Sequence, residues 1–159
     1  VWKVDFGTFG LELDTTNPTI PIVAKVLPNG QAAKWNKWAE PSRKLRPGLG
    51  LRSVDETQDA ARILSVLLEM KGAVTLGFTS PSLHTVKLHR RAGLPLGLCL
   101  TAPEHEAIGL VVMSAQGLAD VAGLKAGMQV IAVDGCRDRP KLLEDIQHAA
   151  VLTLRVASY

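Results

Sequence analysis

The chain has 159 residues, of which 47% are hydrophobic, and its 18 Lys and Arg side chains against 15 Asp and Glu leave a net charge of +3 at pH 7. This composition is typical of a folded chain, and its apolar runs are far shorter than the roughly 20 residues that span a bilayer. The charge is too small for binding to nucleic acid through bulk electrostatics, so a nucleic-acid partner is not expected.

Short strands and two helices are predicted for the first half of the chain. Apolar and polar residues alternate in the strand segments, and the longest helix has apolar residues at helical spacing, with Asp55 or Thr57 as its expected cap. The expected elements are, in order, strands at 2–6, 9–13 and 20–27, a helix at 31–39, a strand at 49–54, a helix at 58–70 and a strand at 73–78.

The second half repeats this order of signals after a linker at 79–82. The expected elements are strands at 85–88, 96–101 and 108–113, a short helix at 118–122, a strand at 129–133, a helix at 140–148 and a strand at 151–156. Strands joined by short links and interrupted by short helices predict a mostly β, α+β fold in which a small, partly open antiparallel barrel is capped by two helices.

The two halves are copies of one another. Matching residues lie 87 positions apart at the start of each copy and 79 apart further on, which places an insertion at about 34–46 of the first copy. The matching pairs are Gly10 with Gly97, Gly30 with Gly117, Gly48 with Gly127, and Asp55 with Asp134. Repeats of this length predict two folded modules, at 1–80 and 83–159, because the units of a solenoid are shorter.

These copies resemble PDZ domains. Thr8-Phe9-Gly10-Leu11 and Pro95-Leu96-Gly97-Leu98 stand where that family has a Gly-Leu-Gly-Phe loop before its second strand. Gly123 to Gly135 is similar to the family's later turn and strand, and Leu45 to Asp55 follows it more loosely. The resemblance implies that an extended peptide adds beside the second strand, and that amide groups of the glycine loop receive its C-terminal carboxylate.

The resemblance also implies which residues form the peptide site. The loop residues receive the carboxylate, Arg90 and Arg91 support it in the second module, and only Lys3 is available for this in the first. The apolar residues line a socket for the last ligand side chain or, alternatively, face the core. The full set is Thr8, Phe9, Gly10, Leu11 and Leu64 in the first module, and Arg90, Arg91, Pro95, Leu96, Gly97, Leu98, Leu142 and Ile146 in the second.

Neither long helix carries the His that selects Ser or Thr in the family's ligands; Ala60, Ala61 and Lys141 lie near that place. This departure favours an apolar or unspecified ligand motif, or no peptide ligand at all.

The insertion in the first copy is rich in cations and tryptophans. Such mixtures suit acidic protein surfaces, membrane headgroups or nucleic-acid backbones, whereas the alternative is that both tryptophans pack on the module and the cations stay solvated. The predicted docking patch consists of Lys34, Trp35, Lys37, Trp38, Arg43, Lys44 and Arg46.

Signals of catalysis or of a cofactor are weak. The four His residues are scattered without ligand spacing, so no metal is expected, and no Gly-x-Ser-x-Gly elbow is present. Cys99 and Cys136 are expected to be free thiols, and no cofactor is expected. The start at Val1 suggests a processed or excised chain, so no compartment is excluded, an organelle included.

Three functions remain open. The leading one is a non-catalytic interaction or scaffold protein that binds a C-terminal or extended peptide. The second is a permanently assembled structural subunit of a larger complex. The third is the regulatory tail of a serine protease similar to the high-temperature-requirement family, although those proteases usually carry a permuted strand order.

Overall fold

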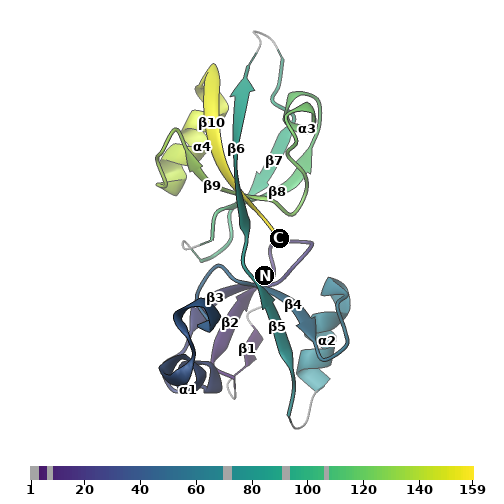
Figure 1. Ribbon diagram of the computed structural model, residues 1–159. Coiled ribbons are helices and arrows are strands. Elements are labelled where there is room, and N and C mark those ends of the chain that lie inside the picture. Colours follow the sequence, from purple (N-terminus) through teal and green to yellow (C-terminus); the bar gives the residue numbers. More distant parts are fainter. Residues whose placement is uncertain (1–3, 7–8, 70–72, 91–93, 106–107) are drawn as a thin grey trace. The chain divides into compact units, whose positions relative to one another are not determined.

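The protein was analysed as a computed structural model that describes residues 4–6, 9–69, 73–90, 94–105 and 108–159. It divides into two compact units, Val1–Ser80 and Pro81–Tyr159 (Figure 1). No helix in the described ranges is long and apolar enough to cross a membrane.

The first unit is a five-stranded antiparallel sheet with two α-helices. Its strands follow one another in the sheet in the order β1-β2-β3-β4-β5. The elements are β1 (Val4–Phe6), β2 (Leu11–Asp14), β3 (Ile22–Val26), α1 (Gln31–Trp38), the 3₁₀ turn η1 (Pro41–Arg43), β4 (Gly50–Val54), α2 (Ala60–Glu69) and β5 (Leu76–Thr79).

The second unit has the same elements in a different strand order, β6-β10-β9-β8-β7. Its elements are β6 (Ser82–His89), β7 (Leu98–Thr101), β8 (Leu110–Ala115), α3 (Leu118–Val121), β9 (Gln129–Val133), α4 (Arg139–His148) and β10 (Val151–Ser158). The predicted fold class is confirmed. Both sheets are open, and neither closes into a barrel.

The units differ in the partner of their first strand. In the second unit β6 pairs with β10 along its whole length, from Ser82 opposite Ser158 to His89 opposite Val151. In the first unit β1 pairs with β2, with Val4 opposite Leu13 and Phe6 opposite Leu11. The edge strands of the described sheets are therefore β6 and β7 in the second unit, but β1 and β5 in the first.

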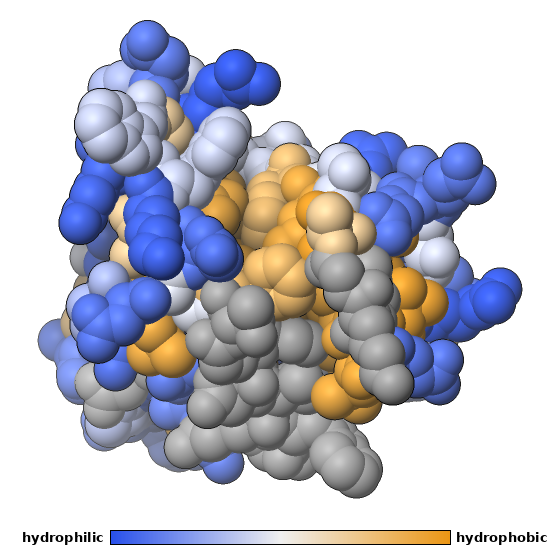
Figure 2. Space-filling view, turned by 90° about the horizontal axis from the view of Figure 1, so that it is seen from below, coloured by the Kyte–Doolittle hydropathy of each residue, from blue (hydrophilic) through white to orange (hydrophobic). Residues whose placement is uncertain are grey.

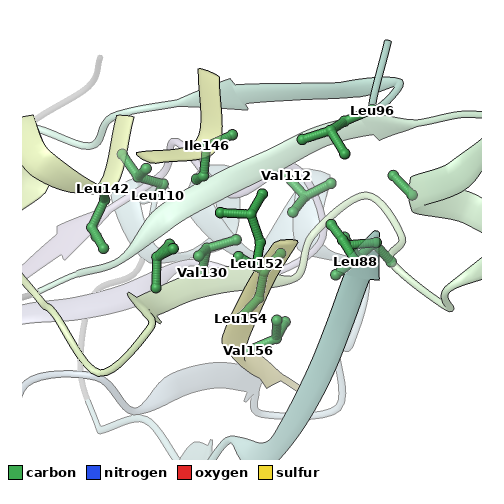
Figure 3. Close-up of a cluster of buried hydrophobic side chains, with 13 residues drawn as sticks. Leu88, Leu96, Leu110, Val112, Val130, Leu142, Ile146, Leu152, Leu154 and Val156 are labelled. Atoms are coloured by element: carbon green, nitrogen blue, oxygen red, sulfur yellow. The ribbon is translucent and has the colours of Figure 1, made fainter. Parts of the chain in front are cut away.

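Each unit has its own hydrophobic core, which forms because alternate strand residues and one helix face point to the same side. In the second unit a cluster of 13 buried residues joins the strands to α4 (Figure 3). Leu142 and Ile146 of α4 pack there with Leu152 and Leu154 of β10. The first unit has a smaller cluster, to which α2 contributes Ile63 and Leu67.

The duplication extends to unusual backbone geometry. Asp55 and Asp134 both have a φ of 48°, in the left-handed region that non-glycine residues rarely adopt. Each carboxylate accepts a hydrogen bond from a threonine near the start of the last strand of its unit, Thr75 N at 2.8 Å and Thr153 N at 2.9 Å. The expected cap of the long helix in the first copy was wrong, since the Asp59 carboxylate accepts from Ala61 N at 3.0 Å while Asp55 bonds to Thr75.

Candidate functional site

The outer edge of β7 is the first part of the candidate site. Within the described residues β7 pairs only with β8, so the backbone groups on its other side are not used by the sheet. Its side chains are half-buried or exposed along the whole strand, Leu98–Thr101. An edge of this kind is a template for an additional strand.

The loop before β7 is fixed in shape by two hydrogen bonds. Leu96 O accepts from Ala119 N at 3.0 Å, and Gly97 O accepts from Gln116 N at 2.7 Å. Gly97 has a φ of 71°, and a Cβ there would lie only 2.1 Å from Gln116 O, so only glycine fits. Because the carbonyls of Leu96 and Gly97 are tied inward, and the N–H of the next residue points away from the carbonyl in a trans peptide unit, this loop presents the N–H groups of Gly97 and Leu98 outward.

The first unit has the same loop but not the same free edge. Phe9 O accepts from Ala32 N at 2.9 Å and Gly10 O from Leu27 N at 2.8 Å, and Gly10 has a φ of 69°. The edge of β2 that corresponds to the outer edge of β7 is occupied by β1. A peptide can therefore add to β2 only if β1 leaves.

Two arginines fix α4 at its ends. The Arg90 guanidinium donates to the carbonyl oxygens of Ile146 and Gln147, in the last turn of the helix. Arg139, the first helical residue, donates to Pro103 O at 2.6 Å and also to the carbonyls of His105 and Ile108. Arg90 also balances the partial negative charge of the helix C-terminus.

These contacts show the structural role of Arg90, which was predicted as a site residue, and of Arg139, which was not. Arg90 was predicted to support a ligand carboxylate; the structure shows its guanidinium bound to α4, and a ligand role stays a prediction. Arg139 was missed, because no sequence signal shows that its side chain reaches carbonyls more than thirty residues away. Arg91, Lys3 and Thr8 lie outside the described residues.

The predicted apolar residues of the second unit come together, mostly in the core. Leu96, Leu142 and Ile146 are buried in one cluster, and Leu98 is half-buried against it (Figure 3). In the first unit Leu11 is buried and Phe9 is half-buried. Leu64 is also half-buried, but the α2 residues in the core are its neighbours Ile63 and Leu67.

The predicted docking patch is also largely brought together. Five of its residues line one cavity of the first unit, whereas Lys37 and Arg46 do not; the five are Lys34, Trp35, Trp38, Arg43 and Lys44. Trp38 is 89% exposed and Trp35 is 50% exposed, so Trp38 does not pack on its unit. The Trp35 indole N–H donates to Arg43 O at 3.1 Å.

Other reactive groups in the described ranges are isolated. Cys99 and Cys136 are free, and no three His, Cys, Asp or Glu side chains come together in a way that could hold a metal ion. Burial raises the pKa of the Tyr159 hydroxyl from 10.0 to about 12, because desolvation disfavours the phenolate.

Known structures similar to this chain are PDZ domains. A choanoflagellate SHANK1 PDZ domain, bound to a GIRK3 peptide, has 20% identity and a TM-score of 0.43, covering 51% of this chain and 97% of that one. INAD PDZ45 in complex with an NG2 peptide has 19% identity and a TM-score of 0.45, and the match covers 94% of this chain and 83% of that one. INAD PDZ45 in a complex with NORPA CC-PBM has 17% identity and a TM-score of 0.46, and the match covers 95% of this chain and 85% of that one.

At these identities and TM-scores the likeness assigns no family to the chain. No family profile matches the sequence, and no curated protein matches it.

Proposed function

We propose that this protein is a non-catalytic interaction or scaffold protein whose second unit binds an extended peptide, in particular a C-terminal tail, by strand addition to β7. The observation that carries the proposal is the outer edge of β7, unpaired within the described residues and continuous with a loop that presents the amides of Gly97 and Leu98.

The chemistry follows from the backbone. A peptide beside β7 exchanges main-chain hydrogen bonds with it, which set its orientation, and its alternate side chains face the unit. A terminal carboxylate next to Gly97 accepts charge-assisted hydrogen bonds from the loop amides. The clamped carbonyls of Leu96 and Gly97 hold those amides in place before the ligand arrives, so little ordering is needed on binding.

The two units are not equivalent in this proposal. In the first unit β1 occupies the edge of β2, so the strand edge that follows the predicted loop at Phe9, Gly10 and Leu11 is already paired within the chain. We therefore assign peptide binding to the second unit and treat a site at β2 as conditional on release of β1.

Selection from a random library of displayed C-terminal peptides tests the proposal. We expect the full chain to enrich a motif, and the enriched peptide to bind at least tenfold more weakly when its carboxylate is amidated, because loss of a charge-assisted hydrogen bond costs about 1.5–3 kcal/mol. No enrichment, or equal affinity of acid and amide, would contradict it.

A permanently assembled structural subunit is the second candidate. It is favoured by the 89% exposure of Trp38 beside exposed cations, because large aromatic side chains are rarely left in water without a partner. Native purification tests it: a stable complex well above 17.0 kDa supports this role, and a monomer contradicts it.

A further inference from the structure

The first unit contains a cavity of about 890 Å³ between β5 and α1, which also reaches Phe9 and Leu11 on either side of Gly10. Its walls are β5, α1 and the segment that follows α1, and its apolar lining includes Phe9, Leu11, Val74, Leu76 and Phe78. The face of this unit seen in Figure 2 has hydrophobic surface, in orange, at its centre, with hydrophilic surface, in blue, on both sides. A volume of this size is typical of ligand sites.

The second unit shows what fills the same place there. Val74, Leu76 and Phe78 correspond to Leu152, Leu154 and Val156, 78 residues later. Those three residues of β10 are 1%, 0% and 0% exposed, and β6 lies directly alongside them.

In the first unit the corresponding residues are only half-buried, and no described strand lies beside β5 on that side. The cavity is therefore a vacant strand position.

The edge of β5 has the geometry to accept a strand. Within the described residues β5 pairs only with β4, through Gly50 opposite Thr79 and Val54 opposite Leu76. In an antiparallel pair, the N–H and C=O groups of successive residues point alternately toward the partner strand and away from it. β5 therefore has hydrogen-bond donors and acceptors on its outer edge, along the cavity. Such an edge is satisfied by strand addition.

The opposite wall of the cavity is held in position. The Asn36 side chain donates to Leu45 O and accepts from Leu45 N, both at 2.7 Å, which ties the segment after α1 back onto the helix. The bond from the Trp35 indole to Arg43 O adds a second link. The backbone positions from which Arg43 and Lys44 extend are therefore fixed at the rim.

The charge of the rim identifies the occupant. Lys34, Arg43 and Lys44 line the cavity, and none of its lining residues is Asp or Glu. An extended strand places alternate side chains on opposite faces, so a segment that alternates apolar and acidic residues meets the apolar lining with one set and the cations with the other. Trp38, largely exposed on the same rim, offers a ring face for the backbone or an apolar side chain.

We propose that the cavity between β5 and α1 binds an extended acidic segment of a partner protein as an additional strand on β5. This site is separate from the β7 edge, because it lies in the other unit and requires no terminal carboxylate. It gives the chain two strand-accepting sites of different selectivity, one in each unit.

A capped peptide of about ten residues, with Val and Glu in alternation and neither terminus charged, is the probe. We expect it to saturate the full-length chain, to protect the amides of Leu76–Thr79 from hydrogen exchange, and to change Trp35 and Trp38 fluorescence. The same peptide with Gln for every Glu is expected to bind at least tenfold more weakly, since several cation contacts are lost.

Charge-reversed variants separate this site from general attraction to a basic chain. The triple variant Lys34→Glu, Arg43→Glu, Lys44→Glu changes only exposed side chains and is expected to weaken binding at least tenfold. The control triple Arg52→Glu, Arg62→Glu, Lys87→Glu carries the same charge change on exposed residues outside the cavity and is expected to bind within twofold of the unmodified chain.

Three outcomes would overturn the proposal: no saturable binding, equal loss in the two triple variants, or protection at β7 in place of β5. Binding of C-terminal peptides is measured at the amides of β7, not at those of β5. A negative result at β5 therefore leaves the proposed function standing.

Discussion

Substituting Gly97 by Ala tests the structural basis of the peptide loop. The added Cβ would lie 2.1 Å from Gln116 O, at a residue whose φ is 71°. The left-handed backbone costs a non-glycine residue about 1–2 kcal/mol, and relieving the overlap adds about 1–3 kcal/mol of strain. Movement of Gln116 also weakens its hydrogen bond to Gly97 O, which contributes about 0.5–1.5 kcal/mol. We expect the second unit to lose about 3–5 kcal/mol of unfolding free energy.

Gly135→Ala is the matched control. Gly135 also has a positive φ, 82°, but a Cβ there would meet no described atom within 4 Å. This control variant should lose only the unfolding free energy that the left-handed backbone costs alanine. That loss is reduced by about 0.4–1 kcal/mol, because alanine lowers the conformational entropy of the unfolded chain. The backbone and entropy terms are common to both variants, so the two are expected to differ by about 1.5–4.5 kcal/mol, from the overlap and the weakened hydrogen bond.

Urea unfolding followed by two probes is the assay. All three tryptophans, Trp2, Trp35 and Trp38, lie in the first unit, so their fluorescence reports that unit, whereas far-UV circular dichroism reports both. We expect Gly97→Ala to shift a circular dichroism transition while the fluorescence midpoint stays unchanged. Equal stability of the Gly97 and Gly135 variants would refute the packing argument for the loop.

Three further predictions concern the second unit. Arg139→Ala is expected to destabilise it by about 2–3 kcal/mol in urea unfolding, because charged hydrogen bonds to three loop carbonyls are lost, whereas Arg137→Ala, an exposed neighbour, should change it by less than about 0.5 kcal/mol; equal effects would contradict the assigned contacts. The Tyr159 pKa is raised above its unfolded value of 10.0 to about 12, so its stabilising contribution is complete below pH 10 and is lost as the pH rises towards 12. After discounting for solvent exposure this contribution is of order 1 kcal/mol, and because Tyr159 is the single tyrosine, ultraviolet titration reads it directly; a midpoint near 10 would refute its burial. Asp134→Asn keeps a side-chain acceptor and tolerates positive φ, so it should lower the unfolding free energy by less than about 1 kcal/mol. Asp134→Val lacks both properties and should lower it by at least about 2 kcal/mol. Equal melting temperatures of the two variants would argue against the turn geometry.

The duplicated turns could be predicted because their chemistry is local. A glycine that must adopt positive φ is visible in the sequence, and Gly10 and Gly97 do so at 69° and 71°. The order of strands and helices could be predicted for the same reason, since alternation and helical spacing act over a few residues. This information was sufficient for the fold class and for the position of the loops.

Long-range choices could not be predicted. The alternation of residues 2–6 indicated a strand but carried no information on whether it pairs with β2 or β5, because both edges offer the same backbone groups. The α2 face was ambiguous because apolar residues surround much of the helix: Ile63 and Leu67 are buried, whereas Leu68 is 67% exposed. Arg139 and Arg90 act on distant carbonyls, and only the folded chain brings those together.

Amide chemical shifts of the labelled full chain, titrated with a selected C-terminal peptide, test the central claim most directly. Strand addition to β7 predicts that the largest shifts fall on Leu96, Gly97 and Leu98–Thr101, and that Leu11–Asp14 of β2 stay unchanged while β1 covers them. Saturating binding with shifts that avoid β7 and its loop would contradict the account.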